Sequence, residues 1–119
     1  MSTATDDLTT ALAIPEGGIA SRPLLDVKGG PKIVLFAIDA GQEISPHQSP
    51  FPAEVVLLTG RMAVSVGEQT WELGPNDRID FPMGPPHGLV ALAPTHFVLT
   101  MLRGATGSRR LGPGLPGAA

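Results

Sequence analysis

The chain has 119 residues and a net charge of −3, with 8 basic and 11 acidic residues. A nucleic-acid-binding protein is expected to present a basic face, and no stretch here concentrates lysine or arginine, so that class is disfavoured. Cysteine is absent, which excludes disulfides, thiolate metal ligands and a cysteine nucleophile. The apolar runs are also far shorter than the roughly 18 residues that a membrane-spanning helix needs.

Short strands separated by turns are the main local pattern of the chain. The 15 glycines and 13 prolines are too frequent for long helices, because proline removes a backbone donor and glycine adds backbone entropy. In chain order, the segments with strand character are residues 32–38, 53–58, 62–66, 70–73, 79–81, 89–92 and 96–102. Strands of about five residues at roughly ten-residue spacing are typical of a β-sandwich or barrel. We therefore expect an all-β fold.

The two ends of the chain differ in composition from the rest. Residues 1–12 are polar and rich in threonine, and residues 104–119 are rich in glycine, proline and alanine. Such compositions predict flexible segments on either side of a single barrel domain over residues 13–103. The first residues include acidic side chains where a secretory signal would carry basic ones, so we expect a cytoplasmic protein.

Two stretches together resemble the two sequence motifs of the cupin family. Gly41–Gly60 contains His47 and closes on a glycine, and Gly74–His87 contains Asp77 at a turn and ends on a histidine. Their order and separation are similar to those of small bacterial RmlC-like cupins, and the resemblance covers about residues 41–91. It implies a double-stranded β-helix, or jelly-roll, barrel whose mouth lies near both motifs.

The resemblance also implies a divalent metal, with two histidines and a glutamate of the first motif and one histidine of the second as ligands. His47 and His87 match two of these positions, but Ser49 stands at the second histidine and Ala53 at the glutamate. Glu54 lies one residue after the glutamate position of the motif. On a strand, a shift of one residue turns the side chain to the opposite face of the sheet unless a bulge intervenes. The first motif is therefore degenerate. We expect Zn, Fe, Mn or Ni to be held weakly or not at all, through His47, His87 and, doubtfully, Glu54.

Alternation along the predicted strands indicates a mostly apolar pocket. Its predicted lining is His47, Ser49, Val55, Leu57, Met62, Phe81 and His87. Such a pocket suits a small, partly apolar molecule. The two histidines could also line it as hydrogen-bonded residues without any metal. The remaining histidine, His96, follows a proline-containing break, and we expect it to be an ordinary strand residue.

Three functions are compatible with this pattern. The first is a module that binds a small molecule, with a weakly held metal or none. The second is a metal-dependent enzyme of dioxygenase or isomerase type, and the third is a subunit with a structural role. No catalytic residue can be assigned, and the enzyme question stays open. Apolar stretches within residues 13–38 exceed what one small barrel covers, and the resemblance implies a homodimer formed through N-terminal strands.

Overall fold

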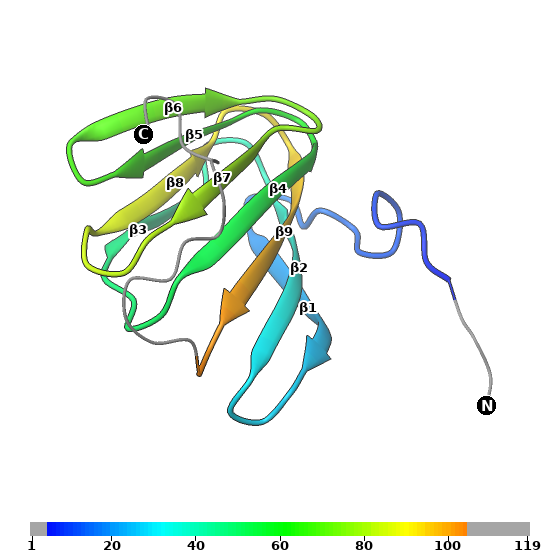
Figure 1. Ribbon diagram of the computed structural model, residues 1–119. Helices are drawn as coiled ribbons and strands as arrows, with labels where there is room; N and C mark the ends of the chain where they lie inside the picture. The colour runs from blue at the N-terminus through cyan, green and yellow to red at the C-terminus, as the bar shows by residue number, and fades with distance from the viewer. Residues whose placement is uncertain (1–4, 105–119) are drawn as a thin grey trace.

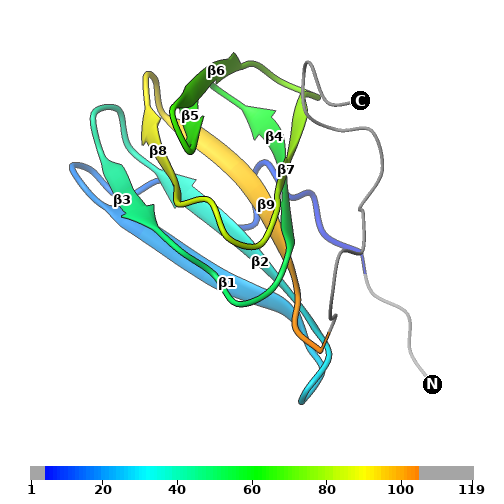
Figure 2. The ribbon, with the colours of Figure 1, turned by 60° about the vertical axis from the view of Figure 1, so that its left-hand side comes forward.

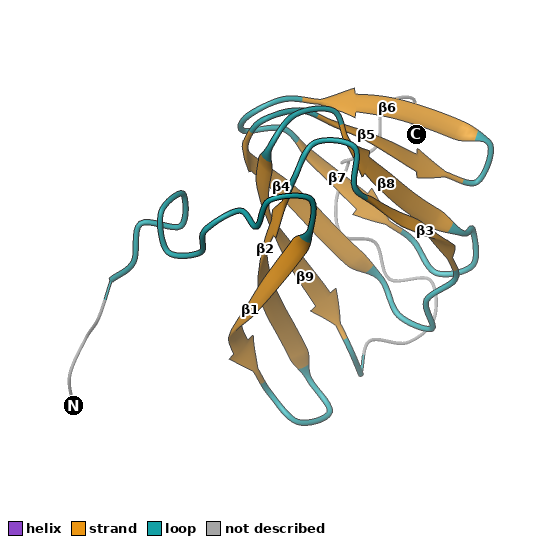
Figure 3. Ribbon diagram, turned by 180° about the vertical axis from the view of Figure 1, so that it is seen from behind, coloured by secondary structure: helices purple, strands orange, loops and turns teal. Residues whose placement is uncertain are grey.

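The computed structural model describes residues 5–104. This part of the chain consists of nine β-strands joined by turns and loops, without a helix (Figures 1 and 3). The strands are β1 (Ile19–Asp26), β2 (Pro31–Ile38), β3 (Glu43–His47), β4 (Ala53–Thr59), β5 (Met62–Val66), β6 (Gln69–Leu73), β7 (Arg78–Phe81), β8 (His87–Ala91) and β9 (Thr95–Leu102). Within the described residues, nothing helical has the length and hydropathy needed to cross a bilayer.

The strands form two antiparallel sheets that face each other (Figure 2). The five-stranded sheet has the order β1-β2-β9-β4-β7, and the four-stranded sheet has the order β3-β8-β5-β6. Most neighbours within a sheet are far apart in the sequence: β9 lies between β2 and β4, and β8 lies between β3 and β5. This is the arrangement of a jelly roll, so the predicted all-β jelly-roll fold is confirmed.

The core lies between the two sheets and follows the alternation of each strand. In β4, Ala53, Val55 and Leu57 are buried, and in β5 Met62 and Val64 are buried as well. Residues between these positions face outward, since successive side chains of a strand point to opposite faces. The alternation therefore settles which face of each strand meets the core.

The turn between β4 and β5 requires glycine at position 60. Gly60 has φ +88°, and a Cβ added there would lie 2.3 Å from the carbonyl oxygen of Pro94 and 2.4 Å from Oγ1 of Thr95. Thr95 is itself fully buried, and its hydroxyl lies 2.7 Å from the carbonyl oxygen of Ala93 and 3.1 Å from that of Arg61. This close approach joins the β4–β5 turn to the start of β9.

The segment before β1 contacts the outer face of the five-stranded sheet. His96 of β9 donates from Nε2 to the carbonyl oxygen of Leu12 at 2.7 Å, and Nδ1 of the same ring lies 3.0 Å from the hydroxyl of Thr59. His96 is thus a strand residue that holds the N-terminal segment, as its predicted place in a strand allows. The predicted tail, apart from Gly104, and residues 1–4 of the predicted N-terminal segment lie outside the described residues.

Candidate functional site

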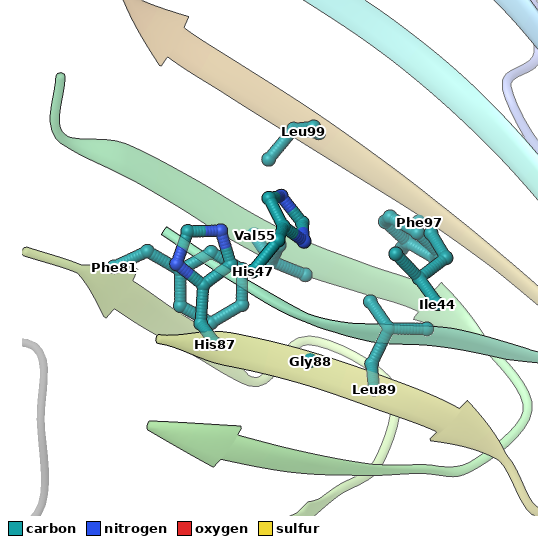
Figure 4. A pocket seen from close by; sticks show the side chains of 9 residues that line it. All are labelled: Ile44, His47, Val55, Phe81, His87, Gly88, Leu89, Phe97 and Leu99. Atoms are coloured by element: carbon teal, nitrogen blue, oxygen red, sulfur yellow. The ribbon is translucent and has the colours of Figure 1, made fainter. Parts of the chain in front are cut away.

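His47 and His87 are direct partners across two neighbouring strands. His47 ends β3, His87 begins β8, and the antiparallel register pairs the two residues. Their ring centroids are 4.6 Å apart with an interplanar angle of 63° (Figure 4). The two histidines carried over from separate sequence motifs therefore meet at one place.

A glycine allows this approach. The register of β3 against β8 shifts between Ile44 and His47, so the end of β3 departs from a regular ladder. At Gly88, an added Cβ would lie 2.9 Å from both the carbonyl oxygen of Ile44 and the nitrogen of Pro46. Only a residue without a side chain lets β3 lie this close to β8.

The backbone fixes the hydrogen-bonding role of His47. Its Nδ1 lies 3.1 Å from the carbonyl oxygen of Ser45. Because a carbonyl oxygen only accepts, Nδ1 carries the hydrogen, and Nε2 of the neutral ring carries the lone pair. The ring is exposed, so this lone pair is available to a ligand.

His87 is in a different environment. Its ring stacks on Phe81 with centroids 4.2 Å apart and planes inclined by 8°, and the residue is only 7% exposed. Burial, together with the nearby charge of His47, lowers the pKa of His87 below its ordinary value of 6.5. Nδ1 of His87 is the one buried side-chain nitrogen or oxygen in the described chain that lacks a hydrogen-bond partner. A buried polar atom of this kind is costly unless a ligand, ion or water meets it.

An apolar cavity of about 50 Å³ opens beside the two rings. In Figure 4 the histidines and Phe81 stand at one end of it, and Ile44, Leu89 and Phe97 stand at the other. A single water needs about 10–15 Å³ on the same scale, so the cavity has room for a few small atoms. A wider recess of about 220 Å³ shares His47, His87 and Leu99 with it. The histidine pair thus stands where an inner cavity and an outer recess meet.

The structure brings most of the predicted pocket residues to this place. His47, Val55, Phe81 and His87 line the inner cavity, and Ser49 lines the outer recess. Leu57 and Met62 are fully buried and face the interior, but they line neither of these spaces. Alternation gives the face of a strand but not the depth of a residue along the barrel, and this corrects the predicted lining.

Several lining residues were missed in the sequence. Ile44 and Leu89 come from the two strands that carry the histidines, and Phe97 and Leu99 come from β9. The alternation of β9 could have shown that Phe97 and Leu99 share a face. It could not have shown which strands β9 would lie between, because that depends on pairing with β4 and β2, which lie tens of residues earlier in the sequence.

Glu54 faces away from the histidines, which corrects its doubtful place among the metal ligands. It lies opposite Asp80 in a regular register between β4 and β7, with no bulge. Its carboxylate accepts from Nε and Nη2 of Arg78 at 3.0 and 2.7 Å, and Arg78 also contacts Asp80. Without a bulge, the one-residue offset of Glu54 places it on the outer face.

The remaining donors fit a divalent metal only in part. Nε2 of His47 is free while its Nδ1–H is held by a backbone carbonyl, which is the usual arrangement of a metal-bound histidine. His87 would supply a second nitrogen. Among residues 5–104, however, no group of three or more histidine, aspartate or glutamate side chains could hold a metal. Ser49 is a poor ligand for these metals, and its hydroxyl is already hydrogen-bonded to the backbone of Phe51 at 2.9 and 3.3 Å.

Comparison with known proteins identifies the fold. The chain matches no protein-family model and no curated protein. It resembles the structure of a conserved protein of unknown function from Streptococcus pyogenes, with 28% identity, a TM-score of 0.81, and coverage of 89% of this chain and 92% of the other. A cupin superfamily protein from Desulfitobacterium hafniense has 18% identity, a TM-score of 0.79, and coverage of 86% and 93%. An RmlC-like cupin from Desulfovibrio desulfuricans has 20% identity, a TM-score of 0.74, and coverage of 86% and 98%. With its two antiparallel sheets and these structural neighbours, the chain is a small protein of the cupin fold.

Proposed function

We propose that the protein binds a small, largely apolar molecule in the cavity beside His47 and His87. The observation that carries this proposal is His87, a residue that lines an apolar cavity and whose buried Nδ1 has no hydrogen-bond partner among the described residues. A pocket that is mostly apolar, with a few convergent polar groups, is the usual form of a small-molecule site. The polar part of the ligand would meet the ring nitrogens of the two imidazoles, and its apolar part would fill the cavity.

A divalent ion could take part in this binding. Zn, Fe, Mn or Ni would be held by His47 and His87, and water or ligand atoms would complete its coordination. Such an ion would supply a positive charge that coordinates a ligand oxygen. With only two protein donors it would exchange readily, so we expect weak binding of the metal.

An enzyme of dioxygenase or isomerase type is the second candidate function, and the geometry favours it less. Catalytic metal sites usually have three protein ligands and keep a further position open. Here Ser49 stands at the position of the second motif histidine and Ala53 at that of the glutamate, and Glu54 is paired with Arg78 on the outer face. The described residues therefore support binding better than metal-dependent turnover.

Elemental analysis and ligand screening together test the proposal. The protein would be purified without chelator, and the bound metal per chain would be measured before and after incubation with Fe, Mn, Ni and Zn salts. A fragment screen on the metal-free protein would follow the ring signals of His47 and His87 by NMR. We expect substoichiometric metal and apolar fragments that shift both rings. Tightly held stoichiometric metal would favour the enzyme, and the absence of any fragment effect on either ring would contradict the binding function.

We also propose a homodimer formed through β1. This strand is the edge of the five-stranded sheet, and it presents Ile19 and Leu25 at 41% and 45% exposure. An exposed edge strand with apolar side chains is a template for pairing with another chain. A second copy that pairs its own β1 would extend the sheet and cover both side chains.

A further inference from the structure

The polar groups around the histidine pair are already engaged. In the outer recess, the side-chain amide of Gln48 donates to the carbonyl oxygen of Gly84 at 3.0 Å. The hydroxyl of Ser49 donates to the carbonyl oxygen of Phe51, and the amide of Phe51 donates back to it at 3.3 Å. His47 and His87 are therefore the groups that a ligand can use without breaking an existing bond.

Apart from the two histidines, no side chain at this place can carry a charge. Among the described residues, the lining of the inner cavity and of the outer recess contains no lysine, arginine, aspartate or glutamate. A carboxylate or ammonium group would leave water without a permanently charged side chain to meet it, which is unfavourable. The lining therefore selects an uncharged molecule.

The two rings are complementary to a group that both donates and accepts a hydrogen bond. Nε2 of the neutral His47 ring can only accept, because Nδ1 holds the hydrogen that it donates to Ser45. His87, when neutral, still has one N–H to donate. A hydroxyl can donate its hydrogen to His47 and accept from His87, whereas a ketone oxygen can only accept.

The two spaces on either side of the pair differ in size. The inner cavity of about 50 Å³ is enclosed by aliphatic and aromatic side chains and has room for a small alkyl group. The outer recess of about 220 Å³ is lined partly by Phe51, Leu99 and Met101, and it can take a larger apolar group. A ligand that uses both spaces must carry its polar group between a small and a large apolar end.

We propose that the site takes an uncharged secondary alcohol, with its hydroxyl at the ring nitrogens of His47 and His87, a small alkyl group inside and a larger apolar group in the recess. This inference rests on the proposed binding function and names its ligand class. The binding would be reversible and would need no metal.

Three matched probes test the inference on isotopically labelled, chelator-treated full-length protein. They are 1-phenylethanol, acetophenone, which lacks the donor, and mandelate, which replaces the small alkyl group by a carboxylate. The affinity of each would be measured by NMR titration of the histidine rings. We expect 1-phenylethanol to bind about tenfold more tightly than acetophenone, as one hydrogen bond would give, and mandelate to bind most weakly.

Two variants complete the test. His47→Ala changes an exposed residue and removes the acceptor, so the affinity for the alcohol is expected to fall to that for the ketone. His96→Gln removes the imidazole on the outer face of the other sheet and should keep the tenfold preference. Equal binding of alcohol and ketone in the parent, or tightest binding of mandelate, would overturn the inference while leaving a binding site in place. If none of the probes shifts either ring, the proposed function is overturned as well.

Discussion

His47 and His87 are paired across β3 and β8 with ring centroids 4.6 Å apart, yet only one of them is oriented by the backbone. His47 donates to the carbonyl oxygen of Ser45, while Nδ1 of His87 is buried without a partner in the described chain. One ring is thus exposed and fixed, and the other is buried and held by stacking on Phe81. This asymmetry leads to different expectations for the two residues.

Acid should destabilise the fold through His87. Burial lowers its pKa in the folded state, so between the folded value and the unfolded value of about 6.5 the unfolded chain binds more protons. The free energy of unfolding therefore falls as the pH drops below about 6.5. Urea unfolding at pH 7.5 and 5.5 would measure this loss in the parent and in His87→Phe, which keeps an aromatic ring against Phe81.

We expect a smaller acid-induced loss in His87→Phe than in the parent. Acid also destabilises the fold through carboxylates whose pKa is lowered in the folded state. One of these is Asp39, which accepts hydrogen bonds from the amides of Gly17 and Ala40. These carboxylates are present in both proteins and contribute equally, so the difference in acid-induced loss between the parent and His87→Phe reports on His87 alone. An identical pH dependence in both would contradict the assignment.

Glu54 should be dispensable for metal binding. Its carboxylate is held by Arg78 on the outer face of the barrel, so Glu54→Gln is expected to leave the affinity for Ni or Zn unchanged. His47→Ala removes one of two nitrogen donors and should lower that affinity at least about tenfold. Calorimetric titration of the chelator-treated proteins would measure both. A drop of similar size in Glu54→Gln would show that Glu54 reaches the metal after all.

Gly60→Ala should be strongly destabilising. The new methyl would lie 2.3 Å from the carbonyl oxygen of Pro94, in addition to the strain of φ +88°. We expect a loss of about 2–4 kcal/mol in the free energy of unfolding. Gly29→Ala is the matched control, because Gly29 has φ +71° but nothing within 4 Å of an added Cβ. Backbone strain alone should lower the free energy of unfolding of Gly29→Ala by about 1 kcal/mol. Equal losses in Gly60→Ala and Gly29→Ala, measured by thermal or urea unfolding, would refute the steric account.

The mass in solution tests the proposed homodimer. Light scattering after gel filtration should give twice the chain mass for the parent, and Leu25→Lys on β1 should shift it toward the monomer. Leu92→Lys is the matched control, since Leu92 is exposed to a similar extent, 49%, but lies in the turn between β8 and β9. A monomeric parent, or dissociation by both substitutions alike, would contradict pairing through β1.

The sequence by itself determined the all-β class, the inward faces of the strands and the two histidines. These follow from local causes: turn residues end each strand, and alternation sends Val55 and Phe81 inward and Glu54 outward. The tertiary structure decided what those residues meet. Phe97 and Leu99 reach the cavity, and Arg78 reaches Glu54, only because the sheets pair strands from distant parts of the chain. A strand's pattern fixes its faces, but the order of strands depends on the packing of the whole core, which no local segment encodes.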